Sequence, residues 1–301
     1  MLCVINSTRM ACLSYSAALT CCYPHPAQYR IISRTFQMKF PKRKPNVAVI
    51  NLHGKIAPSG GLKLLNLENL EKHIEKAFAM KRLQEVCLLI NSPGGSPTQS
   101  DLIANKILHL SKKKNIKVVS FAEDMAASGG YWLACAGSEI YATNNSVVGS
   151  IGVIGMDFGL HEVLKRFDIE TRIYRMGSKK VVGNRFEPET PESKAIRERN
   201  MKTIYKNFID YVKKQRGDRL KAEDEVLFTG EYWIGQDALN LGLVDGIKTL
   251  NDYVYEKYGD DVNVVRVNKS KGGFLAGLFN KSNISISDIV DSLLHPPFKI
   301  M

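Results

Sequence analysis

Residues Asp124–Trp132 read DMAASGGYW, and the interpretation of the whole chain starts from this stretch. It follows an apolar, strand-like run at Ile116–Ala122 and opens a helix-like apolar segment at Tyr131–Ala136. A strand, a tight turn of small residues and a helix would leave the hydroxyl of Ser128 at the mouth of the helix. Backbone N–H groups and the positive end of the helix dipole both favour developing negative charge there. The stretch therefore predicts a nucleophile turn.

The same turn also has a purely structural interpretation, in which small residues permit close packing and Ser128 is an N-cap. A second stretch, NSPGGS at Asn91–Ser96, favours the catalytic interpretation because it too follows a strand-like run, Val86–Ile90. Its two glycines let backbone N–H groups point into a cavity. A nucleophile turn and an N–H-rich turn, each after its own strand, are the two halves of an acyl-transfer site.

Apolar strand-like runs alternate with helical patterns along the body of the chain, which predicts an α/β fold with a covered sheet. We expect strands at Val47–Leu52, Val86–Ile90, Ile116–Ala122, Glu139–Ala142, Val148–Ile154 and Glu170–Arg175. We expect helices at Leu67–Met80, Pro97–Lys113, Leu160–Phe167, Thr190–Arg216 and Trp233–Leu241.

The net charge of +12 is unevenly distributed along the 301 residues. Residues 1–46 carry seven basic side chains and no acidic one, so the remainder is only mildly basic and nucleic-acid binding is not expected. We expect residues 1–46 to be a disordered extension, with Met38 as a candidate start residue. The basic cluster Lys39–Lys44 is suited to a peripheral contact with anionic lipid. Residues 268–301 are expected to be a tail, with an amphipathic helix at Ile284–Leu294.

The cysteines indicate neither a disulfide framework nor a metal site. Cys87 and Cys135 lie in apolar runs and are expected to be reduced core residues. The expected chemistry requires no metal and no nucleotide cofactor.

A serine nucleophile needs a proton acceptor, and the residues alone leave two kinds open. Among the six histidines, His161 is the candidate for a Ser-His-Asp site. A lysine serves equally well where burial lowers the pKa of its ammonium group toward neutrality. Lys180 is followed by Val181 and Val182, which would supply apolar neighbours.

The ordered motifs resemble the protease IV / signal peptide peptidase A family of serine proteases, including its SohB-like members. The resemblance extends from Val47 to Val267. It is carried by SPGG at Ser92–Gly95, DMAASGGY at Asp124–Tyr131, VGSIGV at Val148–Val153, GxxK at Gly177–Lys180, FTG at Phe228–Gly230 and LGLVD at Leu241–Asp245.

This resemblance implies a peptidase domain at residues 47–267 with the Clp/crotonase-type fold of repeated β-β-α units. It implies a Ser–Lys dyad of Ser128 and Lys180, because the family's spacing selects Lys180 over Lys179. It assigns Ser150 to orienting the lysine amine. It also places the N–H groups of Gly95 and Gly129 in an oxyanion hole.

The resemblance further implies a homo-oligomeric ring in which adjacent protomers supply the serine and the lysine of one site. The expected substrates are released signal peptides and other unfolded apolar peptides. The expected location is the periphery of the bacterial inner membrane or the cytoplasm. Two alternatives are a crotonase-like acyl-CoA enzyme, which shares the fold and an oxyanion hole, and a catalytically silent ring scaffold.

Overall fold

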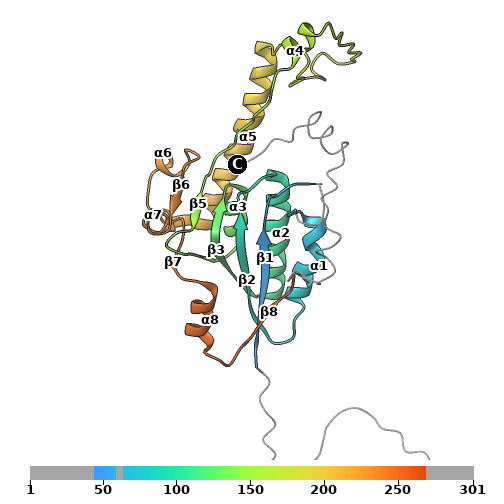
Figure 1. Cartoon of the computed structure of the whole chain (residues 1–301). Helices are drawn as coiled ribbons and strands as arrows, with labels where there is room; N and C mark the ends of the chain where they lie inside the picture. Colours follow the sequence, from blue (N-terminus) through green and yellow to red (C-terminus); the bar gives the residue numbers. More distant parts are fainter. Residues whose placement is uncertain (1–43, 59–63, 269–301) are drawn as a thin grey trace, which may run out of the picture. The chain divides into compact units, whose positions relative to one another are not determined.

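The computed structural model describes residues 44–58 and 64–268, and a mixed sheet lies at their centre (Figure 1). Its strands run in the order β6-β5-β3-β2-β1-β8, and β4 pairs with both β3 and β7. Their bounds are β1 Asn46–His53, β2 Leu83–Ser92, β3 Lys117–Ala127, β4 Glu139–Ala142, β5 Val147–Gly149, β6 Tyr232–Ile234, β7 Gly246–Ile247 and β8 Asn263–Arg266.

Parallel pairing places the ends of β1, β2 and β3 at one edge of the sheet. Ile50 pairs with Leu88, and Leu88 in turn pairs with Ser120. The segments that follow these three strands therefore emerge side by side. They include the SPGG turn after β2 and the Ser128 turn after β3.

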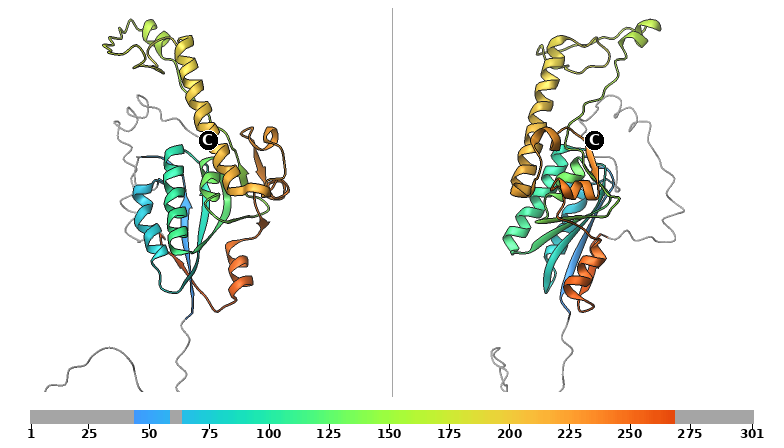
Figure 2. Two further views of the ribbon diagram at one scale, coloured as in Figure 1. Left: turned by 180° about the vertical axis from the view of Figure 1, so that it is seen from behind. Right: turned by 90° about the vertical axis from the view of Figure 1, so that its left-hand side faces the viewer.

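Helices cover the two faces of the sheet because side chains alternate along each strand. Ala48 and Ile50 of β1 belong to the core that packs against α1 Leu67–Phe78, α2 Pro97–Lys114 and α3 Gly129–Ala134. Val47 and Val49 face α8 Leu250–Tyr258 on the other side. Figure 2 shows α1 and α2 on one face of the sheet and α8 on the opposite face.

The long helix α5, Pro191–Arg216, packs against α3 through its carboxyl-terminal half. Trp132 of α3 stacks on Phe208 and Tyr211 of α5, with ring centroids 5.0 Å and 4.9 Å apart. The other end of α5 carries the segment that contains α4, His161–Arg166 (Figures 1 and 2). The remaining helical segments are a 3₁₀ helix at Gly217–Arg219, α6 Asp224–Leu227 and α7 Gln236–Asn240.

Asp157 links the α4 segment, residues 155–190, to α5. It pairs with Arg185 of the same segment and, at 3.5 Å, with Arg197 of α5. The side chains of Asp157 and Arg185 are largely buried. The α4 segment is therefore fastened to the amino-terminal half of α5.

The expected α/β fold is confirmed by this architecture, which is built from successive strand–helix units. Three details of the expectation are wrong. Glu170–Arg175 forms no strand, the strand predicted at Val148–Ile154 ends at Gly149, and the helix predicted at Trp233–Leu241 begins with the edge strand β6. The extension at residues 1–43, including Met38, and the amphipathic helix predicted at Ile284–Leu294 lie outside the described residues.

Candidate active site

Ser128 stands between β3 and α3 in a strained backbone conformation. Its φ is 53° and its ψ is −118°, a region that non-glycine residues rarely adopt. Its N–H donates to the carbonyl of Gly149 at 2.7 Å, which fixes the turn against the end of β5. Ser128 is fully buried, and its Oγ has no hydrogen-bond partner among the described residues.

Ser128 occupies the N-cap position of α3, as the structural interpretation expects, but its side chain makes no capping bond. A buried hydroxyl without a partner raises the free energy of the folded chain relative to one that is bonded or hydrated. A side-chain capping bond therefore does not explain why a serine stands at this position.

The SPGG turn passes close to Ser128 because two of its residues lack a side chain. Gly94 has a φ of 95°, and a Cβ on it would lie 2.7 Å from the backbone N of Gly129. A Cβ on Gly129 would in turn lie 3.3 Å from the backbone N of Gly95. The two N–H groups predicted for the oxyanion hole are thus brought together. Neither has a hydrogen-bond acceptor among the described residues.

Ser150 follows the residue that holds the Ser128 turn. The carbonyl of Gly149 accepts from Ser128 N–H, and Ser150 N–H donates to the carbonyl of Glu231 at 2.7 Å. Ser150 has a φ of 52°, so both predicted serines share the left-handed region. The structure therefore places Ser150 beside the turn that carries Ser128.

Lys180 is exposed and belongs to the α4 segment. Figure 1 shows α4 near the end of α5 that is remote from α3. Lys179 is exposed as well and pairs with Glu192 at 3.0 Å. Within one chain the structure does not bring Lys180 to Ser128. The described residues likewise do not supply the burial expected around this lysine, which is exposed.

His161, the alternative base, begins α4 and lies in the same remote segment. Its Nε2 is 3.6 Å from Glu162. No described histidine bonds to Ser128. No group of described acidic, histidine or cysteine side chains could hold a metal ion.

Burial raises the pKa of ionisable groups in α3 and at its C-cap residue, Cys135. It raises the pKa of the Cys135 thiol to about 12 and that of the Tyr131 hydroxyl well above its usual value. The Tyr131 hydroxyl donates to the carbonyl of Leu243 at 2.8 Å. Both groups are therefore neutral and structural at physiological pH, which agrees with the expected core role of Cys135.

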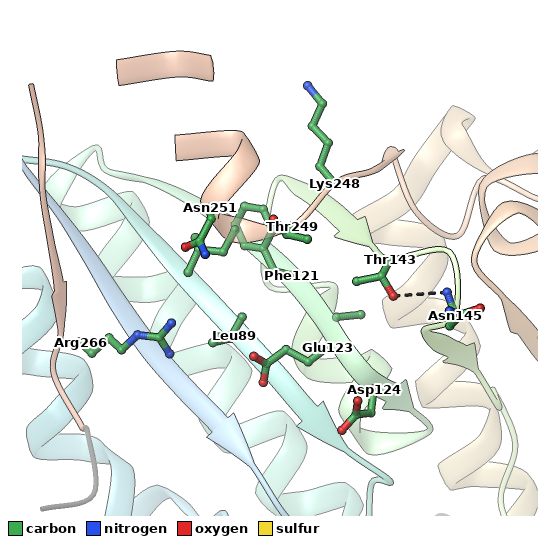
Figure 3. Close-up of a pocket in the computed structure, with 12 residues that line it drawn as sticks. Leu89, Phe121, Glu123, Asp124, Thr143, Asn145, Lys248, Thr249, Asn251 and Arg266 are labelled. Carbon is green, nitrogen blue, oxygen red and sulfur yellow. Dashed lines mark hydrogen bonds between the residues drawn. The ribbon is translucent and has the colours of Figure 1, made fainter. Parts of the chain in front are cut away.

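A separate pocket of about 320 Å³ lies on the α8 face of the sheet (Figure 3). Its floor includes Leu89 and Phe121. Its acidic residues already have partners, because Glu123 pairs with His53 at 2.7 Å and Asp124 accepts from Asn91 at 2.6 Å. These contacts join β3 to β1 and β2.

The sequence is similar to that of known proteins. The sequence matches Peptidase family S49 over residues 110–264, about half of the chain, and this range includes Ser128, Ser150 and Lys180. A protein named Na(+)/H(+) antiporter NhaA, from Brucella abortus (strain 2308), is 39% identical over 245 residues, which are 80% of this chain and 33% of that protein. A probable protease SohB of Haemophilus influenzae is 32% identical over 177 residues, which are 59% of this chain and 49% of that protein.

A solved structure of a 1510-N membrane-bound stomatin-specific protease with a substrate peptide has a TM-score of 0.47 at 14% identity. The match covers 78% of this chain and 97% of that one. The chain spans only a third to a half of the length of the two curated relatives above. Among the helices of the described residues, none has both the length and the hydropathy needed to cross a bilayer. Because the family match covers about half of the chain, the chain belongs to peptidase family S49.

Proposed function

We propose that the chain is a serine endopeptidase with Ser128 as its nucleophile and Lys180 as its general base. The observation that carries the proposal is the buried, unpartnered Oγ of Ser128 on a strained turn, next to the two open N–H groups of Gly95 and Gly129. A nucleophile needs a free lone pair, and an oxyanion needs nearby donors that are not otherwise occupied. Both requirements are met at this turn.

The proposed reaction proceeds in two steps. The neutral amine of Lys180 takes the proton of Ser128 while Oγ attacks the peptide carbonyl, and the carbonyl oxygen becomes an oxyanion held by Gly95 and Gly129. Collapse breaks the C–N bond, and the lysine returns its proton to the leaving amine. A water molecule, activated by the same amine, then hydrolyses the acyl ester and restores Ser128. In this proposal Ser150 orients the lysine amine.

We propose that Lys180 reaches Ser128 from a neighbouring copy within a homo-oligomeric ring. The α4 segment supports this, because it presents large apolar side chains to solvent. Tyr174 and Met176 are 93% and 94% exposed, and Phe158 and Phe167 are also exposed. Apolar surface of this extent favours contact with another protein surface.

The proposed substrates are unfolded apolar peptides, released signal peptides among them. A pocket of about 400 Å³ supports this class of substrate. Its lining is largely apolar and includes Gly152, two residues after Ser150. Met201, Tyr205 and Phe228 contribute to it. Extended peptides offer side chains to such a pocket, whereas folded proteins keep theirs buried. The proposed location is the periphery of the bacterial inner membrane, where the basic cluster Lys39–Lys44 would contact anionic lipid, or the cytoplasm.

The test compares casein cleavage by the unmodified chain and by Ser128→Ala, Lys180→Ala and Lys179→Ala. Loss of at least about 10³-fold is expected for the first two variants, and near-normal activity for the third. Equal loss at Lys179 would reassign the base. Full activity of Ser128→Ala would refute the proposal.

Two other outcomes would point to the alternatives. Turnover of an acyl-CoA thioester that survives Ser128→Ala would indicate a crotonase-like enzyme. Assembly without labelling of Ser128 by a serine-reactive phosphonate would indicate a silent scaffold.

A further inference from the structure

Ile56, in the segment between β1 and α1, is bonded through its backbone to the SPGG turn. Its N–H donates to the carbonyl of Gly94 at 2.9 Å, and its carbonyl accepts from Ser96 N–H at 2.8 Å. The two bonds form an isolated parallel bridge between Ile56 and Gly95. Since the bridge uses the neighbours of Gly95, the N–H of Gly95 itself faces away from Ile56.

Gly95 and the carbonyl of Ile56 lie so close together that no side chain fits between them. A Cβ on Gly95 would lie 1.9 Å from the carbonyl oxygen of Ile56, so the two backbones are already at van der Waals distance. The segment around Ile56 is anchored as well, because Gly54 N–H donates to the carbonyl of Asn91 at 2.9 Å and Leu65 N–H donates to that of Lys55 at 2.9 Å. Ile56 therefore holds the SPGG turn from a fixed position.

The side chain of Ile56 lies close to the other half of the site. Ile56 is 1% exposed, and a Cβ on Gly129 would lie 3.2 Å from its Cδ1. One residue thus bridges to the SPGG turn through its backbone and places its side-chain end beside Gly129. No motif marks it, because an isoleucine after a strand is usually a core residue.

An oxyanion hole works only when its donors lie about 2.7–3.1 Å from the developing charge. A displacement of about 1 Å at a reacting centre can reduce the rate about 100-fold. We propose that Ile56 is a positioning residue that sets the spacing between the N–H groups of Gly95 and Gly129. This inference rests on the proposed peptidase function and adds to it a residue that touches neither substrate nor reacting atom.

The test uses Ile56→Val, which removes only the Cδ1 methyl group and keeps the branched Cβ. The matched control is Ile74→Val on α1, because Ile74 is fully buried in the same core. For Ile56→Val we expect kcat to fall about three- to tenfold with KM unchanged, and inhibition by a peptide aldehyde to weaken by the same factor. Ile74→Val should change neither. Ile56→Leu, which retains δ carbons, should recover part of the loss.

Unfolding by urea, measured in parallel, separates positioning from stability. Both valine variants lose one buried methyl group, so similar shifts in the urea midpoint are expected while only Ile56→Val loses kcat. Equal losses of kcat in the two variants, or no loss in Ile56→Val, would overturn the inference and leave the proposed function standing. Absence of Ser128-dependent cleavage by the unmodified chain would overturn both.

Discussion

Backbone conformations that side chains disfavour gather at the candidate site. Ser128 and Ser150 have φ values of 53° and 52°, and Gly94 and Gly95 have values of 95° and 144°. Each non-glycine residue held in such a conformation raises the free energy of the folded chain by about 1–3 kcal/mol. The surrounding structure must enforce them. Here the enforcing contacts are the bond from Ser128 N–H to Gly149 and the bridge at Ile56.

Replacing Gly94 by alanine should disable the site by a local clash. The new Cβ would lie 2.7 Å from the backbone N of Gly129 and 2.9 Å from Ser128 Cβ, so the nucleophile turn would have to move. We expect peptidase activity to fall at least about 100-fold. The control is Gly259→Ala, which has a φ of 58° and nothing within 4 Å of the new Cβ. That variant should lose about 1–2 kcal/mol of stability and keep its activity. Comparable activity in the two variants would contradict the account.

Raising the pH should destabilise the protein through Cys135. Folding raises the pKa of this thiol from about 9 to about 12. Above about pH 9 the unfolded chain therefore releases a proton that the native chain retains, and stability falls until about pH 12. Urea unfolding at several pH values should show a steeper alkaline loss for the unmodified chain than for Cys135→Ala. Parallel curves for the two would refute the assignment.

How far the sequence predicts the candidate site depends on the residue. Gly95, Gly129 and Ser128 were predictable because small residues directly after a buried strand indicate a tight turn with accessible backbone N–H groups. Ile56 was not, since its role depends on a backbone bridge to a residue about 40 positions away and its side chain has no distinctive chemistry. The Ser128–Lys180 pairing stays a prediction, because the structure of a single chain does not bring the two side chains together.

At the scale of elements, α3 is held by aromatic stacking. Trp132 lies against Phe208 and Tyr211 of α5, and Phe208 is fully buried. Phe208→Ala should lower the free energy of unfolding by about 3–5 kcal/mol. Phe167→Ala, at a side chain that is 71% exposed, should change it by less than about 0.5 kcal/mol. Chemical denaturation of both variants checks this, and similar losses would contradict the packing described.

The long, strongly apolar elements were predictable to within a few residues, and the short ones were not. The apolar runs predict β2 and β3, and the helical pattern at Thr190–Arg216 predicts α5. Trp233 was assigned to a helix, but it pairs with Val148 in a three-residue edge strand. A strand was expected at Glu170–Arg175, yet within the part of the chain that the structure describes no strand pairs with it. Pairing partners are set by tertiary structure, so periodicity alone does not reveal them.

At the scale of the whole molecule, mixing two inactive variants should restore activity. If adjacent protomers supply Ser128 and Lys180, a ring assembled from equal amounts of Ser128→Ala and Lys180→Ala contains some sites with both native residues. Random mixing predicts about a quarter of the normal activity. The measurement is casein cleavage after the two variants are co-assembled by joint refolding or co-expression. Size-exclusion chromatography confirms the mixed particle, and each variant alone is the control. No recovery in a verified mixed assembly would show that one protomer supplies both residues.

The distance between the two ends of α5 has a consequence for chains that have just been synthesised. If each site takes Ser128 and Lys180 from different copies, a single chain has its hydroxyl at one end of this helix and its amine at the other. Such a chain cannot cut the unfolded neighbours that surround it during translation. Hydrolysis would begin only where copies accumulate beyond the dissociation constant of their assembly. Local abundance would then act as the trigger, and dilution would return the enzyme to an inert form.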